Sequence, residues 1–179
     1  MNGRRLVVGV TGGIAAYKTA ALVSRLVQGG ADVYVVMTRA AEKFIGPDTF
    51  AALTGHPVPR RMFGDAHHPL GAHIDLAGAD LLCVAPATAN FMARAAQGLA
   101  GDLLSTLYLA FKGRVLFAPA MNDRMWQHPA MRRNVELLRG DGVEFVGPEA
   151  GWLSCRTSGP GRMADPEQIE AAIQRLLAH

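Results

Sequence analysis

The sequence has 179 residues and half of them are apolar, so a single domain with a sizeable hydrophobic core is expected. The formal net charge is only +3 and the basic residues are scattered, which disfavours a nucleic-acid-binding protein. No apolar run is long enough to span a bilayer. Two arginines and a short apolar stretch near the N-terminus imitate a signal peptide, but no convincing cleavage site follows, and we expect a cytoplasmic protein.

Strands and helices are predicted to alternate along the chain. A valine-rich run at 6–10 is typical of a strand buried on both faces, and apolar residues at helical spacing predict a helix over 14–28. The later elements, in chain order, are a strand at 32–37, a short helix at 46–55, an irregular region at 56–73, a strand at 79–88, two helices broken near Gly98 within 89–111, a strand at 114–119, a mostly helical stretch at 123–142, a strand at 143–147, an irregular loop at 147–163 and a closing helix at 165–179 with Asp165 as its N-cap.

This alternation predicts an α/β fold, in which a doubly wound parallel sheet lies between two layers of helices. The whole chain, 1–179, is expected to form one domain. Ligands of such sheets bind beyond the carboxyl ends of the strands. The segments of interest are therefore the turns "TGG", "MTRA", "APATAN" and "APAMN", together with the glycine-rich loop at 147–163.

The turn "TGG" follows the first strand and opens a helix. Gly12 and Gly13 allow the backbone to approach an anion, and the first N–H groups of the helix are free to bind it. The segment is neither the dinucleotide fingerprint nor a Walker A loop, so it is also compatible with a simple tight turn. Thr38, after the second strand, either caps the next helix or donates to a phosphate or ribityl hydroxyl.

The turns "APATAN" and "APAMN" are similar to each other. Each ends a strand at a proline and then offers an asparagine, Asn90 or Asn122. Two unrelated turns could share this pattern by chance, but convergence on one ligand is the sharper hypothesis. Asn122 is also unusual because its neighbours Met121, Met125 and Trp126 are apolar.

Histidines and cysteines are the candidate chemical groups. Four of the six histidines (His56, His67, His68 and His73) fall in the irregular region, and none has the spacing of a metal site, so no metal is expected. A lone histidine such as His73 is more often structural than catalytic. Cys83 lies in an apolar run and is expected to be buried, whereas Cys155 lies in a polar loop.

Taken in order, several segments resemble one family. "VTGGIAAYK", "HIDL", "APATANFMARAAQGLAGDLLS", "PAMNDRMW" and "CRTSGPGRM" are similar to motifs of the homo-oligomeric flavin-containing cysteine decarboxylases. The resemblance covers essentially the whole chain. It implies a flavodoxin-like sheet, bound FMN, and a homo-oligomer (a trimer or a dodecamer) with the flavin at subunit contacts.

The resemblance also implies roles for individual residues. The residues expected to bind FMN are Gly12, Gly13 and Ile14 at the phosphate end, Ser105 near the phosphate, and Thr38, Arg39, Ala40, Phe44, Thr88, Ala89, Asn90, Phe91 and Ala120 along the flavin. The residues expected to bind substrate are Asn122, Met125, Trp152, Leu153, Ser154 and Arg156, some of them on a substrate flap at about 147–163. His73, Asn122 and Cys155 are expected to be catalytic.

Within the family, the resemblance is strongest to enzymes that convert 4'-phosphopantothenoylcysteine to 4'-phosphopantetheine for coenzyme A. A cysteinyl carboxylate has no electron sink, but oxidation of the thiol by FMN creates one, and carbon dioxide can then leave. His73 would act as a base near the thiol, and Asn122 would hold the carboxylate without adding a charge. Cys155 would then donate a proton as the enethiol is reduced.

The chain departs from the family pattern after the cysteine. Arg156 and Thr157 stand where glycine and aspartate are usual, so Arg156 either binds the substrate phosphate or indicates a different substrate. A peptidyl-cysteine decarboxylase of lantibiotic-type maturation and a non-catalytic FMN-binding subunit remain alternatives, although Cys155 disfavours the first, and His73 with Cys155 disfavours the second. A flavin prenyltransferase would lack "PAMN". We expect any synthetase partner to be a separate protein.

Overall fold

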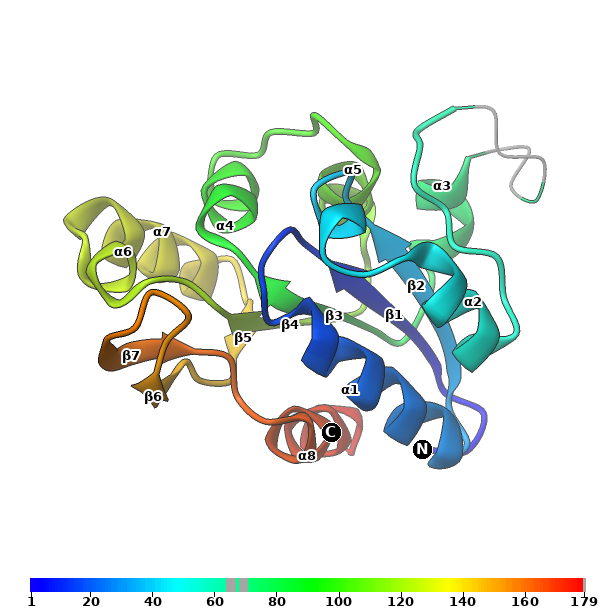
Figure 1. Ribbon diagram of the computed structural model, residues 1–179. Coiled ribbons are helices and arrows are strands. Elements are labelled where there is room, and N and C mark those ends of the chain that lie inside the picture. Colours follow the sequence, from blue (N-terminus) through cyan, green and yellow to red (C-terminus); the bar gives the residue numbers. More distant parts are fainter. Residues whose placement is uncertain (64–66, 68–70, 179) are drawn as a thin grey trace.

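The structure is a computed structural model that describes residues 1–63, 67 and 71–178. Five parallel strands form the central sheet: β1 (Arg5–Val10), β2 (Asp32–Met37), β3 (Leu81–Ala87), β4 (Arg114–Pro119) and β5 (Glu144–Phe145). Their order across the sheet is β2-β1-β3-β4-β5, which is the flavodoxin-like order (Figure 1). The predicted α/β flavodoxin-like fold is therefore confirmed.

The middle of the sheet is buried on both faces. Val8 of β1 is aligned with Val35 on one side and with Cys83 on the other, and Cys83 is aligned in turn with Leu116 of β4. Every residue of β3 is buried. This burial explains why the strands are nearly continuous apolar runs rather than alternating ones, and it raises the pKa of the Cys83 thiol to about 12.

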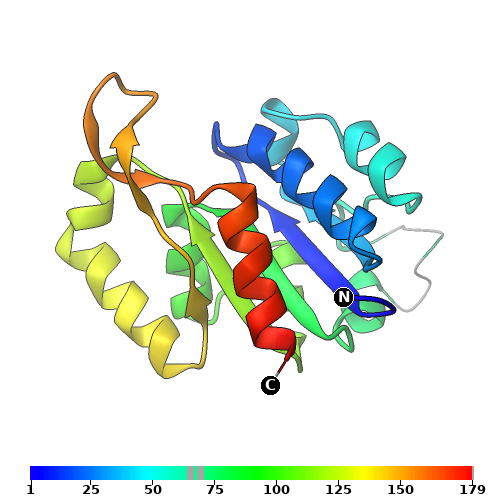
Figure 2. The same cartoon turned by 90° about the horizontal axis from the view of Figure 1, so that it is seen from below.

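Helices cover both faces of the sheet. One face carries α1 (Ala16–Gln28), α2 (Pro47–Thr54) and α8 (Pro166–Leu177), and the other carries α3 (Ala72–Leu76), α4 (Ala89–Ala96), α5 (Leu103–Ala110) and α7 (Pro129–Gly140). Figure 2 shows α1 and α8 side by side across the first of these faces. The apolar stripe of α1, which includes Leu22, Val23 and Leu26, is fully buried there. No helix among the described residues combines the length and the apolar character needed to cross a membrane.

Some element boundaries differ from those predicted. A short 3-10 helix, η1 (Ala41–Lys43), and α3 were not predicted, and β5 is shorter than expected. The helical stretch predicted at 123–142 divides into α6 (Asp123–Gln127) and α7. It divides at His128, which is extended with a ψ of 136° because the following residue is Pro129. Two predicted positions, His68 and the end of the closing helix at His179, lie outside the described residues.

The prediction of an irregular loop at 147–163 was wrong. This segment forms an antiparallel hairpin of β6 (Glu149–Trp152) and β7 (Ser158–Arg162), which lies beside α6 (Figure 1). Glycine and proline are tolerated because each of the two strands is an edge strand. The glycines also permit close approach: a Cβ on Gly159 would lie 2.9 Å from the Cβ of Asp123, and one on Gly161 would collide with the carbonyl of Met121.

Candidate active site

A cavity of about 1000 Å³ opens beyond the carboxyl ends of the strands, the edge at which parallel sheets bind ligands. The turns after β1, β2, β3 and β4 line it, together with the hairpin and the start of α8. The predicted site residues found on its wall are Gly12, Gly13, Ile14, Thr38, Arg39, Ala40, Thr88, Ala89, Asn90, Phe91, Ala120, Asn122, Met125, Trp152, Leu153, Ser154 and Cys155. The two similar turns, "APATAN" and "APAMN", thus meet at one cavity.

The glycine turn after β1 brings the backbone against its neighbours. A Cβ on Gly12 would collide with the Cβ of Ala40, and one on Gly13 would lie 3.3 Å from the Cγ2 methyl of Thr88. The helix α1, all of whose residues are described, begins here with no side-chain cap and no acidic residue in its first turn. The N–H groups of Ala16 and Lys18 donate to the carbonyls of Gly13 and Ala15 at 3.0 and 2.9 Å, so an anion in the cavity would be attracted mainly by the positive end of the helix dipole.

Thr11 joins this turn to the turn after β3. Only 2% of Thr11 is exposed, and its Oγ1 lies 2.6 Å from the carbonyl oxygen of Pro86 and 3.0 Å from Oγ1 of Thr88. The N–H of Thr88 donates to the same Thr11 oxygen at 3.2 Å. Strand order reverses between β1 and β3, so this contact lies at the switch point of the sheet.

The charged side chains on the cavity wall favour an anionic ligand. Four of them are cationic and two are anionic: Lys18, Arg39, Arg94, Arg162, Asp102 and Asp165. The Nζ of Lys18 lies 2.7 Å from Asp165 and holds the pKa of that carboxyl below its usual range. Arg94 lies 3.5 Å from Asp102. Two positive charges remain in excess after both carboxylates are counted, which suits a phosphate or a carboxylate.

Asn122 and Cys155 meet on the cavity wall, one from the turn after β4 and the other from the hairpin. The Oδ1 of Asn122 accepts the N–H of Arg124 at 2.9 Å, which caps α6, and its Nδ2 donates to the Sγ of Cys155 at 3.1 Å. A backbone N–H can only donate, so the cap fixes which end of the amide is oxygen. Asn122 therefore presents its NH2 group, and not its oxygen, to the thiol.

The Cys155 thiol has a second partner in the turn of the hairpin. Its Sγ lies 3.0 Å from the hydroxyl of Thr157, and this hydrogen bond, with the one from Asn122, holds the pKa of the thiol below its ordinary value. The intervening residue, Arg156, has a φ of 65°, in the left-handed region that favours glycine. The backbone thus accounts for the glycine that is usual at this position in the family that the sequence resembles.

Four predicted site residues do not line the cavity of their own chain. Phe44 is about half exposed outside it, and Arg156 is exposed at the tip of the hairpin. Ser105 is fully buried in a capping box, where its N–H donates to Oδ1 of Asp102 at 2.8 Å. His73 lies on α3, where its Nδ1 is buried and has no hydrogen-bond partner among the described residues. Their predicted roles stay predictions.

Comparison with known protein families identifies the family to which the chain belongs. The family model described as Flavoprotein matches residues 1–178, nearly the whole chain. The chain belongs to the flavoprotein family. This confirms the flavoprotein membership expected from the sequence motifs.

Relatives of this flavoprotein include bacterial proteins named coenzyme A biosynthesis bifunctional protein CoaBC. The one from Bacillus subtilis (strain 168) is 46% identical over 179 residues, which cover 99% of this chain and 44% of that protein. The one from Escherichia coli (strain K12) is 47% identical over 180 residues, covering 100% of this chain and 44% of that protein. The chain therefore spans less than half the length of these curated relatives.

Solved structures are similar to this flavoprotein over almost the entire chain. A PPC decarboxylase mutant complexed with pantothenoylaminoethenethiol has a TM-score of 0.87 and 25% identity, covering 98% of this chain and 99% of that one. The FMN-dependent cysteine decarboxylase SpaF has a TM-score of 0.84 and 35% identity, covering 98% of this chain and 96% of that one.

Sequence reasoning missed part of the flavoprotein's cavity wall. The missed residues are Thr11, Ala15, Tyr17, Lys18, Arg94, Asp102, Met121, Gly161, Arg162, Met163 and Asp165. Helical spacing could have found two of them, because Lys18 is four residues after Ile14 and Arg94 is four after Asn90. Asp165 carries no such signal, because its place depends on the packing of α8 against α1.

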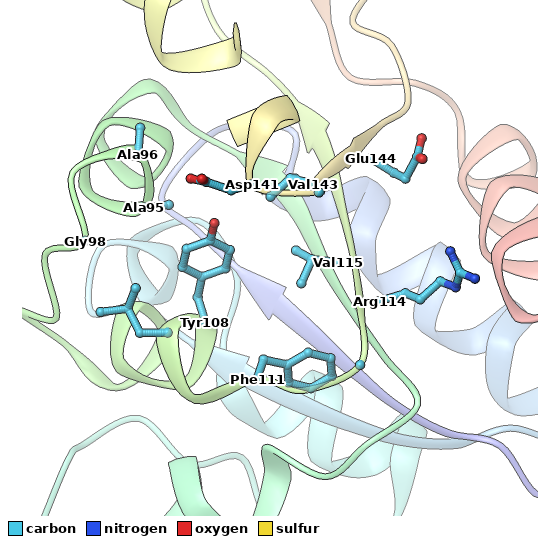
Figure 3. A pocket seen from close by; sticks show the side chains of 13 residues that line it. Ala95, Ala96, Gly98, Tyr108, Phe111, Arg114, Val115, Asp141, Val143 and Glu144 are labelled. Atoms are coloured by element: carbon cyan, nitrogen blue, oxygen red, sulfur yellow. The ribbon is translucent and has the colours of Figure 1, made fainter. Parts of the chain in front are cut away.

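A second pocket of this flavoprotein, of about 510 Å³, lies elsewhere (Figure 3). It is lined by the last turns of α4 and α5, the start of β4 and the turn before β5. The hydroxyl of Tyr108 and the carboxylate of Asp141 lie toward one another in it, and burial together with Asp141 raises the pKa of Tyr108 (Figure 3). It opens near the amino ends of the strands and holds none of the predicted site residues, so the larger cavity is the candidate active site.

Proposed function

We propose that this flavoprotein uses bound FMN to decarboxylate 4'-phosphopantothenoylcysteine to 4'-phosphopantetheine, a step of coenzyme A biosynthesis. The observation that carries the proposal is the contact of Asn122 with Cys155, which brings an amide donor and a thiol together on the cavity wall. The names of the relatives support it, since they include CoaBC proteins and a PPC decarboxylase.

The cavity fits FMN in charge and in shape. A side chain at Gly12 would collide with Ala40 and one at Gly13 would press on Thr88, and the turn leads to the positive end of the α1 dipole, which suits the phosphate. The excess of cationic side chains suits the same dianion. Ile14 and Met121 add apolar surface to the wall, as the flat flavin ring requires. Bound FMN would supply the oxidation of the substrate thiol that makes decarboxylation possible, and the later re-reduction.

Asn122 is suited to orient the departing carboxylate. Its oxygen is held by the N–H of Arg124, so its NH2 group is the one that a carboxylate would meet. A neutral donor binds an anion without the strong attraction that a cation would exert, and so opposes the loss of carbon dioxide less. Substrate binding would transfer this NH2 group from the Cys155 sulfur to the carboxylate. Beyond Asn122, the side chains of Met125 and Trp152, which also line the cavity, would contact the substrate.

Cys155 is suited to act as the proton donor in the second half of the reaction. The hydrogen bonds from Thr157 and Asn122 lower the pKa of its thiol, which makes it a better acid. Its place on the hairpin, away from the sheet, lets it approach the reacting carbon as the flap closes. Arg156, the next residue, would then reach the phosphate of the substrate from the exposed tip.

His73, the proposed base, would act in the cavity of a neighbouring copy. It lies on α3 and does not line the cavity of its own chain, and Ile74 beside it is 55% exposed. Large apolar side chains are also exposed on the cavity wall, at Ile14 and Tyr17, and outside the cavity at Phe44. Surfaces of this kind are typical of subunit contacts. We infer a homo-oligomer, a trimer or a dodecamer, in which α3 of one copy adjoins the cavity of the next.

Decarboxylation of a C-terminal peptidyl cysteine is the second candidate. The similarity to SpaF, a cysteine decarboxylase, favours it. A peptide enethiol product would need no proton from a hairpin cysteine, however, so the hydrogen-bonded Cys155 thiol favours the coenzyme A reaction. A non-catalytic FMN-binding subunit would have no use for either His73 or Cys155.

The test is to incubate the FMN-loaded protein separately with 4'-phosphopantothenoylcysteine and with a peptide that ends in cysteine. Carbon dioxide and 4'-phosphopantetheine from the first substrate are the expected products. Turnover of the peptide alone, to an enethiol, would replace the proposal by the second candidate. No carbon dioxide from either substrate, with FMN bound, would support the non-catalytic role.

The location of the protein and the source of its substrate follow from the same proposal. We propose a cytoplasmic location, which fits a step of coenzyme A synthesis. The curated relatives are bifunctional by name, and this chain matches 44% of the length of each. We propose that a synthetase activity, on this protein beyond the matched region or on another one, produces the cysteinyl substrate.

A further inference from the structure

The hydroxyl of Thr11 is a buried polar group at the switch point of the sheet, and its bonds bind two cofactor loops together. It contacts the carbonyl of Pro86 near the end of β3 (2.6 Å), and both the N–H (3.2 Å) and the hydroxyl (3.0 Å) of Thr88 in the turn that follows. No other side chain in the described part of the chain bridges these two turns by a hydrogen bond. Beyond the last paired residues of β1 and β3, Gly9 and Val84, these bonds are therefore what ties the two turns together at the cavity.

The same bonds decide whether the Thr88 hydroxyl acts as a donor or as an acceptor toward a ligand. Thr11 has one hydroxyl proton, and the Pro86 carbonyl, its shortest contact, can only accept it. The same Thr11 oxygen lies 3.0 Å from the Thr88 hydroxyl, and with its one proton given to Pro86 this second contact is a hydrogen bond only if Thr88 donates. Thr88 lines the cavity, so it meets a ligand there through a lone pair and not through a proton.

An acceptor at Thr88 is selective for one part of FMN. The ring carries an N–H group and the ribityl chain carries hydroxyls, and these can donate to an oxygen lone pair. The phosphate at neutral pH offers only acceptors, which would repel it. The Thr88 oxygen therefore suits the ring or ribityl portion, whereas the glycine turn and the start of α1 suit the phosphate.

We propose that Thr11 is a positioning residue for the flavin: it holds the two cofactor loops at a fixed separation and turns Thr88 into a hydrogen-bond acceptor for the ring or ribityl chain. The inference rests on the proposed function in assuming that FMN occupies this cavity. Thr11 acts through Thr88 and need not touch the flavin.

The chain offers a matched control in Thr19. Its hydroxyl is also fully buried and donates to a backbone carbonyl of the same strand, that of Ala85, at 2.7 Å. Thr19 does not line the cavity. Thr19→Val and Thr11→Val thus remove the same kind of buried hydroxyl, bonded to adjacent residues of β3, and only the second disturbs Thr88.

The experiment measures the Kd of the apo-protein for FMN and for riboflavin, which lacks the phosphate, by fluorescence titration. Thermal unfolding of each apo-variant measures the structural effect. Thr11→Val is expected to raise the Kd values for FMN and for riboflavin by the same factor, about tenfold or more. Without Thr11, the Thr88 oxygen is no longer held as an acceptor for the ring or ribityl chain. Thr11→Ser keeps the hydroxyl and is expected to stay within about threefold of the parent, as is Thr19→Val. Thr88→Val leaves the bond of Thr11 to Pro86 in place and is expected to weaken both ligands equally, which supplies the measurement if Thr11→Val does not fold.

Three results would overturn the inference. Equal losses of affinity in Thr11→Val and Thr19→Val would reduce Thr11 to a residue that only stabilises the fold. A loss for FMN without a loss for riboflavin, in Thr11→Val or Thr88→Val, would place Thr88 at the phosphate. If the parent binds neither ligand, the proposed function fails first, and this inference fails with it.

Discussion

Asn122→Asp separates the two jobs of this side chain, because the structure assigns a different atom to each. The Oδ1 atom caps α6 by accepting the N–H of Arg124, and an aspartate oxygen would do the same. The Nδ2 atom donates toward Cys155 and the proposed carboxylate position, and the aspartate has no donor to replace it. The free energy of unfolding should therefore change by less than about 0.5 kcal/mol, whereas catalysis should suffer.

The size of the catalytic loss follows from the lost bond. A hydrogen bond to a charged group is worth about 1.5–3 kcal/mol, and tenfold corresponds to about 1.4 kcal/mol, so loss of the donor alone lowers kcat/KM by about tenfold to a hundredfold or more. The new carboxylate also faces that of the substrate, so Asn122→Asp should be at least as severe as the upper figure. Asn122→Ala should lose the amide and the cap together, which adds about 1 kcal/mol of instability.

Stopped-flow reduction of the bound flavin by substrate, with carbon dioxide release as a second measure, would report the first half of the reaction. Asn134→Asp makes the same chemical change on α7, outside the cavity, and should behave like the parent. If Asn122→Asp binds and decarboxylates at the parental rate, the carboxylate lies elsewhere. If it unfolds more readily than Asn122→Ala, the capping argument is wrong.

The remaining predictions concern the base, the thiol and the hairpin tip. His73→Asn should keep FMN and the oligomer but lose about a hundredfold or more in turnover, measured as carbon dioxide release, and near-parental turnover would leave His73 a structural residue. Cys155→Ser should release about one carbon dioxide per flavin and then stall with the enethiol, which mass spectrometry would detect; full reduction at the parental rate would refute the proton-donor role. In the parent, iodoacetamide near neutral pH should alkylate the exposed Cys155 well before Cys83, because the pKa of the first thiol is lowered and burial raises that of the second to about 12; mass spectrometry that found Cys83 labelled first would contradict the burial of Cys83. Arg156→Gly should raise the free energy of unfolding by about 1 kcal/mol by relieving its positive φ, while the KM for the phosphorylated substrate rises; Arg156→Ala should share only the second effect, and an unchanged KM in both would remove Arg156 from the substrate site.

The sheet and the loops at its carboxyl edge could be predicted because their signals are local. Buried parallel strands are continuous apolar runs, and each strand ends in glycine, proline or a polar residue that marks a turn. "TGG" and "APATAN" could thus be assigned to one edge of the sheet from the sequence alone. Helix α3 was missed because five residues are too few to show helical periodicity.

The hairpin and the ion pairs of the cavity wall depend on contacts that the local sequence does not reveal. Gly159 and Gly161 suggested an irregular loop, but they are needed for the close approach of β7 to α6 and Met121. The pairing of Lys18 with Asp165 depends on two helices that are distant in the sequence and pack side by side. The proposed role of His73 in the cavity of a neighbouring copy depends on contacts between copies, which no pattern within one chain reveals.

The hairpin is attached to the body of the protein near its base and carries its chemistry at the tip. Its base is fixed by backbone and glycine contacts, including the N–H of Met121 donating to the carbonyl of Gly161 at 3.0 Å. The turn at 153–157 is held mainly by its own bonds between Leu153, Arg156 and Thr157. Residues at the tip can therefore change without disturbing the flavin loops, so evolution or a designer could retune substrate choice there. A library randomised at 154 and 156, with Thr157 kept because it holds the Cys155 thiol, would retain FMN and sample new cysteinyl substrates.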